Sequence, residues 1–214
     1  MITPQEASAR ALEICQLAPI VPVLVVEDAS IAQDLARTLV AGGLPALEVT
    51  LRTDAALEVI AEMAKVEGGV VGAGTLLTPA DVRAAKAAGA KFGVSPGATD
   101  TLLDACEAED LPLLPGAASA TEAMRLLERG YTVQKFFPAE AAGGAAALKA
   151  IGAPIPQIRF CPTGGVNPKN AQDYLSLPNT VCAGGSWVCP KDLIDARDWS
   201  AIEELARKAS QLSV

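Results

Sequence analysis

Three polar side chains alternate with apolar ones between residues 46 and 52, in the order Ala-Leu-Glu-Val-Thr-Leu-Arg. If this segment is a β-strand, Glu48, Thr50 and Arg52 share one face, because successive side chains of a strand point to opposite sides. A carboxylate and a guanidinium that face a protein interior are costly unless they pair or act on a bound molecule. The segment therefore predicts either groups that work on a ligand or an internal Glu–Arg pair that fills the interior.

A single lysine, Lys135, lies between Val133 and the pair Phe136-Phe137. Surface lysines usually sit near the end of an element among polar neighbours, which is not the case here. Apolar surroundings disfavour a charged ammonium, so a fraction of such an amine is neutral and nucleophilic. A neutral amine is what imine formation with a ketone requires. The lysine is weak evidence alone, and it gains weight beside a buried carboxylate.

Two glycine pairs follow short apolar runs in the last third of the chain, at Gly164-Gly165 and Gly184-Gly185, and Ser186 comes next. Glycines allow backbone N–H groups to approach an anion, and a following helix N-terminus favours negative charge. Each pair alone could be a tight turn. Two pairs at corresponding positions predict a phosphate site. Two other loops offer smaller signals: Thr75 could donate to a carboxylate and Pro96 could stiffen a pocket wall, although both also suit plain turns.

The chain contains no histidine. Ser-His-Asp and Cys-His nucleophile systems and His-ligated zinc are therefore excluded. An enzyme of this sequence must use Lys, Glu, Asp, Cys, Tyr or a bound cofactor. This restriction favours Lys135 and Glu48 as the reacting pair.

The composition limits the partners and the compartment. The net charge of −8 argues against nucleic acid and anionic membrane as partners. The five cysteines form no CxxC pair and are expected to be free, buried thiols of a reducing compartment. The sequence shows no leader and no apolar run of about 20 residues, the length that spans a bilayer. The expected location is the cytoplasm.

Short β-branched runs alternate with Ala-rich stretches of helical spacing along the whole chain, after an amphipathic helix over residues 1–16. Such alternation predicts right-handed βαβ units and a parallel sheet. Eight units in one domain, residues 1–214, favour a closed (β/α)8 TIM barrel with an extra N-terminal helix. The alternative is an open doubly wound sheet, but no GxGxxG follows the first strand. The expected strands are Ile20–Val26, Ala46–Leu51, Val70–Gly74, Phe92–Ser95, Leu111–Pro115, Thr132–Phe137, Ile158–Pro162 and Val181–Gly184.

The barrel explains why polar residues far apart in the sequence should meet. Active sites of this fold lie at the carboxyl ends of the strands and in the loops that follow, and phosphate often binds after the last two strands. Glu48, Lys135 and both glycine pairs occupy such positions. The sequence therefore predicts one site at that end.

Six segments match a known family in order along nearly the whole chain: EVTLR (48–52), GAGT (72–75), SPG (95–97), KFFPAE (135–140), FCPTGG (160–165) and GGSW (184–187). Together they closely resemble the 2-keto-3-deoxy-6-phosphogluconate (KDPG) aldolase family of the Entner–Doudoroff pathway. KFFPAE and CPTGG are highly specific. The segment PGAAS (115–119) departs from the Thr-Pro-containing loop of the family, which leaves the pocket wall after the fifth strand open.

The resemblance implies a class I aldolase, a homotrimer without metal or other cofactor, that cleaves its phosphorylated keto acid to pyruvate and glyceraldehyde 3-phosphate. The site residues that it implies are Lys135 as the Schiff-base lysine, Glu48 as the general acid/base, Arg52 and Thr75 near the carboxylate, Thr163 beside the pyruvate part, Pro96 and Phe137 in the pocket wall, and Gly164, Gly165, Gly184, Gly185 and Ser186 around the phosphate.

Other functions stay open at this point. A sister aldolase could act on the galactonate epimer or on 4-hydroxy-2-oxoglutarate with the same lysine chemistry. An isomerase or a non-catalytic sensor would keep the glycine pairs and leave Lys135 without a role. A metal-dependent aldolase would need clustered carboxylates, which the sequence does not offer.

Overall fold

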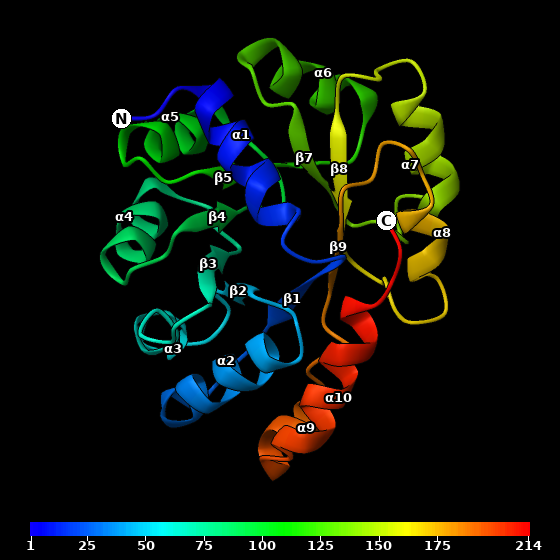
Figure 1. Ribbon diagram of the computed structural model, residues 1–214. Coiled ribbons are helices and arrows are strands. Elements are labelled where there is room, and N and C mark those ends of the chain that lie inside the picture. Colours follow the sequence, from blue (N-terminus) through cyan, green and yellow to red (C-terminus); the bar gives the residue numbers. More distant parts are fainter.

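The computed structural model describes all residues, 1–214. Figure 1 shows a ring of strands surrounded by helices. The strands are β1 (Ile20–Leu24), β2 (Ala46–Thr50), β3 (Val70–Gly74), β4 (Phe92–Val94), β5 (Leu113–Leu114), β6 (Gly116–Ala117), β7 (Val133–Phe136), β8 (Arg159–Pro162) and β9 (Ala183–Gly185). Every expected strand is present, within a few residues of its predicted bounds.

All strand pairs are parallel, and the ring closes. Six strands pair in the order β5-β4-β3-β2-β1-β9, and three in the order β6-β7-β8. Bridges at Phe160–Thr180 and Thr163–Gly184 connect the two groups. On the other side only Pro115 separates β5 from β6, and its carbonyl accepts a hydrogen bond from the Lys135 N–H at 2.8 Å. β5 and β6 are thus halves of one barrel strand, and the predicted (β/α)8 barrel is confirmed.

The helices surround the ring and begin where the sequence provides caps. They are α1 (Pro4–Cys15), α2 (Ala32–Ala41), α3 (Ala56–Met63), α4 (Pro79–Ala87), α5 (Asp100–Ala108), α6 (Ala120–Arg129), α7 (Gly144–Gly152), α8 (Ala171–Leu175), α9 (Lys191–Ala196) and α10 (Trp199–Ser210), with a 3-10 turn η1 (Ala29–Ile31). Capping boxes start α1, α4 and α6 at Thr3, Thr78 and Ser119, where each hydroxyl accepts an N–H of the first turn.

The buried apolar residues form two distinct clusters. The larger contains 51 buried residues and joins strands to helices; Leu47 and Val49 of β2 belong to it. The smaller contains nine residues, among them Cys15, Val133 and Cys161. Cys15 is the last residue of α1, which also receives hydrogen bonds at Ser8 from the backbone at the start of β7. The N-terminal helix therefore covers the amino-terminal end of the barrel and leaves the carboxyl end for a site.

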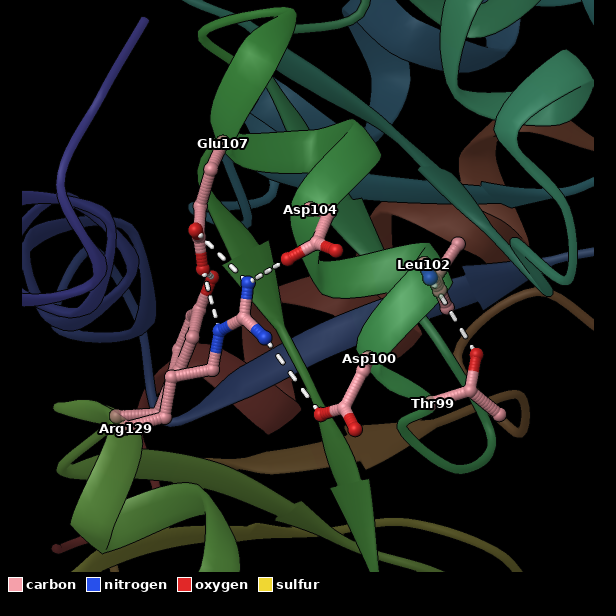
Figure 2. A network of polar contacts seen from close by, with 7 residues as sticks. Thr99, Asp100, Leu102, Asp104, Glu107 and Arg129 are labelled. Carbon is pink, nitrogen blue, oxygen red and sulfur yellow. Dashed lines mark hydrogen bonds and ion pairs between the residues drawn. The ribbon is translucent and has the colours of Figure 1, made fainter.

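An arginine at the end of α6 ties this helix to α5 (Figure 2). Arg129 donates to both carboxylate oxygens of Glu107, at 2.8 and 2.9 Å, and also pairs with Asp104 and Asp100. The hydrogen bonds with Glu107 raise the pKa of Arg129, so its charge is fixed. These carboxylates are committed to holding two outer helices together.

The cysteines behave as predicted: all five are free and buried. None of the helices combines the length and the apolar character that a bilayer span requires.

Candidate active site

A cavity of about 330 Å³ opens among the carboxyl ends of the strands. It is lined by Val23, Glu48, Thr50, Arg52, Thr75, Pro96, Lys135, Phe137, Thr163, Gly164, Gly165, Val166, Gly184 and Ser186. Eleven of the twelve residues singled out for a site therefore meet here, and only Gly185 does not.

Lys135 and Glu48 face each other across this cavity. They come from β7 and β2, which lie on opposite sides of the ring. Their exposed fractions are only 5% and 3%, and Lys135 Nζ lies 3.4 Å from Glu48 Oε1. The Nζ atom also lies 5.0 Å from the centre of the Phe137 ring. An amine and a carboxylate are thus enclosed together, close enough to exchange a proton directly or through one water.

Burial raises the pKa of Glu48 above its usual value, and the nearby Lys135 charge offsets only part of this effect. Room for the carboxylate comes from Gly74 on the neighbouring β3: a Cβ at this position would lie 2.3 Å from Glu48 Oε1. Gly74 is therefore a positioning residue that sequence reasoning missed. Gly74 lies in the GAGT segment, and its physical signal was a glycine within a strand, which often marks a close approach.

The alternative of an internal Glu–Arg pair is wrong, because Glu48 pairs with Lys135 instead. Thr50 is buried and donates its hydroxyl to the Leu24 carbonyl at 2.9 Å. The same hydroxyl accepts the Nε–H of Arg52 at 3.2 Å. Arg52 has no carboxylate partner in the protein, so an oriented guanidinium is available to an anion in the cavity.

The loops after β3 and β4 form one wall. Thr75 has a φ of 63°, and its hydroxyl makes no hydrogen bond within the protein. This left-handed backbone is unusual for a β-branched residue. Pro96 lies beside it in the lining, and Gly116 allows the Pro96 loop to approach the fifth barrel strand, since a Cβ there would lie 2.3 Å from the Pro96 carbonyl oxygen. The segment that departs from the family pattern thus contributes a close contact to this wall.

The opposite wall consists of the predicted phosphate loop, Gly164-Gly165, with Gly184 and Ser186 beside it. Gly164 and Gly165 have φ values of 100° and 82°, and the N–H groups of residues 164–166 donate no hydrogen bond within the protein. Successive unbonded N–H groups in a turn suit an anion. The expectation that a helix N-terminus follows directly after this loop is wrong, because α8 begins only at Ala171 and has five residues.

Gly185 has a different place. It is buried, and a Cβ there would lie 1.9 Å from Cζ3 of the Trp187 ring. The residue makes room for an indole and does not line the cavity. Val23 and Val166 also line the cavity and were not predicted, because an apolar side chain carries no chemical signal of its own.

Comparisons with known proteins agree along nearly the whole chain. The sequence model of the KDPG and KHG aldolase family matches residues 12–205. A 2-dehydro-3-deoxy-phosphogluconate aldolase from Pseudoalteromonas atlantica is 53% identical over 192 residues, 89% of each chain.

Two solved structures have the same fold with a TM-score of 0.90. The KDPG aldolase of Zymomonas mobilis, in complex with 3-phosphoglycerate, is 47% identical, and the match covers 95% of this chain and 97% of that one. The KDPG aldolase of Legionella pneumophila, with pyruvate captured as a covalent carbinolamine, is 45% identical over 94% of this chain and 98% of that one.

Proposed function

Because the chain belongs to the KDPG and KHG aldolase family, we propose that it reversibly cleaves 2-keto-3-deoxy-6-phosphogluconate to pyruvate and D-glyceraldehyde 3-phosphate, with Lys135 as the Schiff-base lysine. The observation that carries the assignment of residues is the buried contact of 3.4 Å between Lys135 Nζ and Glu48 Oε1. The carbinolamine of the Legionella relative is the first covalent product of such a lysine with a ketone.

The reaction follows from this pair. The neutral amine of Lys135 attacks C2 of the ketone, and loss of water gives a protonated imine. The electron pair of the C3–C4 bond then moves toward the imine carbon and nitrogen, while Glu48 takes the proton of the C4 hydroxyl, directly or through one water. Glyceraldehyde 3-phosphate leaves, and an enamine remains. Glu48 returns its proton to C3, and hydrolysis of the imine releases pyruvate and the free lysine.

The two ends of the substrate bind opposite walls in this proposal. Arg52 and Thr75 hold the carboxylate, and the phosphate lies on the N–H groups of Gly164 and Gly165 with Gly184 and Ser186 nearby. Thr163 contacts the pyruvate part, and the apolar faces of Pro96 and Phe137 complete the cavity. Such anchoring at a distance from the reacting bond fixes its orientation. Gly185 is left out of the phosphate contacts because it lies behind the wall.

Thr75 provides a test of the carboxylate end. We expect Thr75→Gly to raise KM for the phosphorylated keto acid about tenfold, the effect of losing a hydrogen bond to a charged group. The free energy of unfolding should stay within about 1 kcal/mol of the original, because relief of the left-handed backbone offsets the extra entropy of glycine. Steady-state kinetics and urea unfolding measure both. Thr75→Ser keeps the hydroxyl and should keep KM; a tenfold rise there would contradict the role.

We extend the proposal to the whole chain and its setting. Residues 1–214 act as one barrel domain, in a homotrimer, in the cytoplasm, on a small phosphorylated keto acid and not on nucleic acid or membranes. The five free thiols support a reducing compartment, and the net charge of −8 disfavours polyanionic partners. Cleavage of 4-hydroxy-2-oxoglutarate is a second activity, supported by the description of the matching family.

The direct test is pyruvate release. The purified chain should release pyruvate from the gluconate-series substrate faster than from its galactonate epimer, and a chelator should leave the rate unchanged. Faster cleavage of the epimer would favour the sister aldolase. No pyruvate from either compound would favour an isomerase or a sensor, which the buried Lys135–Glu48 pair disfavours.

A further inference from the structure

A buried tyrosine and a carboxylate form a hydrogen bond next to the phosphate loop, outside the cavity lining. The Tyr174 hydroxyl, from α8, donates to Oε1 of Glu140, five residues after Lys135 in the chain. Tyr174 is fully buried, and burial raises the pKa of its hydroxyl, so the hydroxyl keeps its proton at neutral pH. The reaction described above uses neither residue.

Glu140 is in direct contact with the loop. Its backbone N–H donates to the Gly164 carbonyl at 3.0 Å, and a Cβ at Gly165 would lie 2.6 Å from its Cγ atom. The side-chain stem of Glu140 therefore lies flat against Gly165, a contact that only glycine permits.

The other side of the loop is held by the segment just before α8. The side-chain amides of Asn167 and Asn170 both donate to the Gly165 carbonyl, at 3.0 and 3.1 Å. The carbonyl groups of the loop are thus committed to the protein, while the N–H groups of residues 164–166 are unbonded. Tyr174 links Glu140 to the asparagine segment, because Tyr174 lies on α8, directly after that segment, and its hydroxyl donates to the Glu140 carboxylate.

We propose that Tyr174 and Glu140 are positioning residues for the phosphate end of the substrate. The hydrogen bond fixes the Glu140 side chain against Gly165, and this contact keeps the N–H groups in the geometry that accepts a phosphate. The inference rests on the proposed function, since it needs a phosphorylated substrate.

If this is so, loss of the hydrogen bond should weaken the reaction of phosphorylated ligands and leave that of unphosphorylated ligands nearly unchanged. Tyr174→Phe and Glu140→Ala should raise KM for the phosphorylated keto acid about three- to tenfold, the range for one lost hydrogen bond. Exchange of the methyl protons of pyruvate with deuterated water uses the same lysine and carboxylate but involves no phosphate. The rate of this exchange should change less than about twofold, because pyruvate has no phosphate to lose a hydrogen bond with the loop. Glu140→Gln retains an acceptor for Tyr174 and should retain KM.

Asp173→Asn is the matched control, an exposed acid beside Tyr174 on the same helix. Unchanged KM in Tyr174→Phe and Glu140→Ala would overturn the inference. Equal loss of cleavage and of pyruvate exchange would also overturn it, because it would indicate a general structural role. Glu140 is exposed, so Glu140→Ala remains informative if Tyr174→Phe does not fold. Failure of the proposed function is distinguishable, since the unmodified chain would then not cleave the phosphorylated substrate.

Discussion

Lys135→Ala should lower kcat/KM for the phosphorylated keto acid by on the order of 10⁵-fold, the scale seen when a covalent nucleophile is removed. Without the amine there is no imine to accept the electron pair of the C3–C4 bond, and no other lysine lines the cavity. Steady-state pyruvate release measures the loss. The fold should survive, because the Glu48 carboxyl, whose pKa burial already raises, can take a proton when its partner is gone.

Lys149→Ala is the matched control for this variant. Lys149 lies on α7, is exposed and is the nearest following lysine in the sequence. It should keep full activity, and circular dichroism should show the same helical content in both variants. Full pyruvate release by Lys135→Ala would contradict the Schiff-base role of Lys135.

Glu48→Gln should lower kcat/KM by about 10²- to 10⁴-fold, the usual contribution of a general acid/base. The amide cannot take the proton of the C4 hydroxyl or return one to the enamine. Covalent capture of pyruvate should persist, because Lys135 is intact, while exchange of pyruvate methyl protons should be lost. This separation between adduct formation and proton transfer identifies Glu48 as the proton carrier.

The pH profile gives an independent check. Glu48 must be ionised to take the proton, so kcat/KM rises with pH through the pKa of this group and falls below it. Because burial raises that pKa, the acid limb should lie above the usual range of glutamic acids. Glu58→Gln, an exposed change on α3, should leave the limb in place; loss of the limb there would contradict the assignment.

The sequence predicts the reacting pair because the barrel topology places the ends of all its strands on one side of the ring. Alternation places Glu48 inward on β2 while Leu47 and Val49 pack against helices, and apolar neighbours mark Lys135 on β7. Parallel strands then bring both groups to the same end of one ring. Local capping patterns at Thr78 and Ser119 are equally legible, because a capping box involves only four successive residues.

Contacts between segments that are distant in the sequence cannot be predicted in this way. The role of Gly74 becomes visible only once β3 pairs with β2, because this pairing places the Glu48 carboxylate against Gly74. Gly185 resembles a phosphate glycine in sequence, yet its space is filled by Trp187, two residues later. The bond between Tyr174 and Glu140 joins residues 34 positions apart. Glu140 ends the KFFPAE segment, but nothing in the sequence links it to Tyr174.

Reduction of the adduct with pyruvate shows directly whether Lys135 forms the Schiff base. The chain is incubated with pyruvate and borohydride, digested, and sequenced by mass spectrometry. We expect the peptide containing Lys135 to gain the mass of pyruvic acid less one oxygen atom. The gain should lie on Lys135, and Lys135→Ala should show none. A modification at another lysine, or cleavage activity without any trapped adduct, would contradict it.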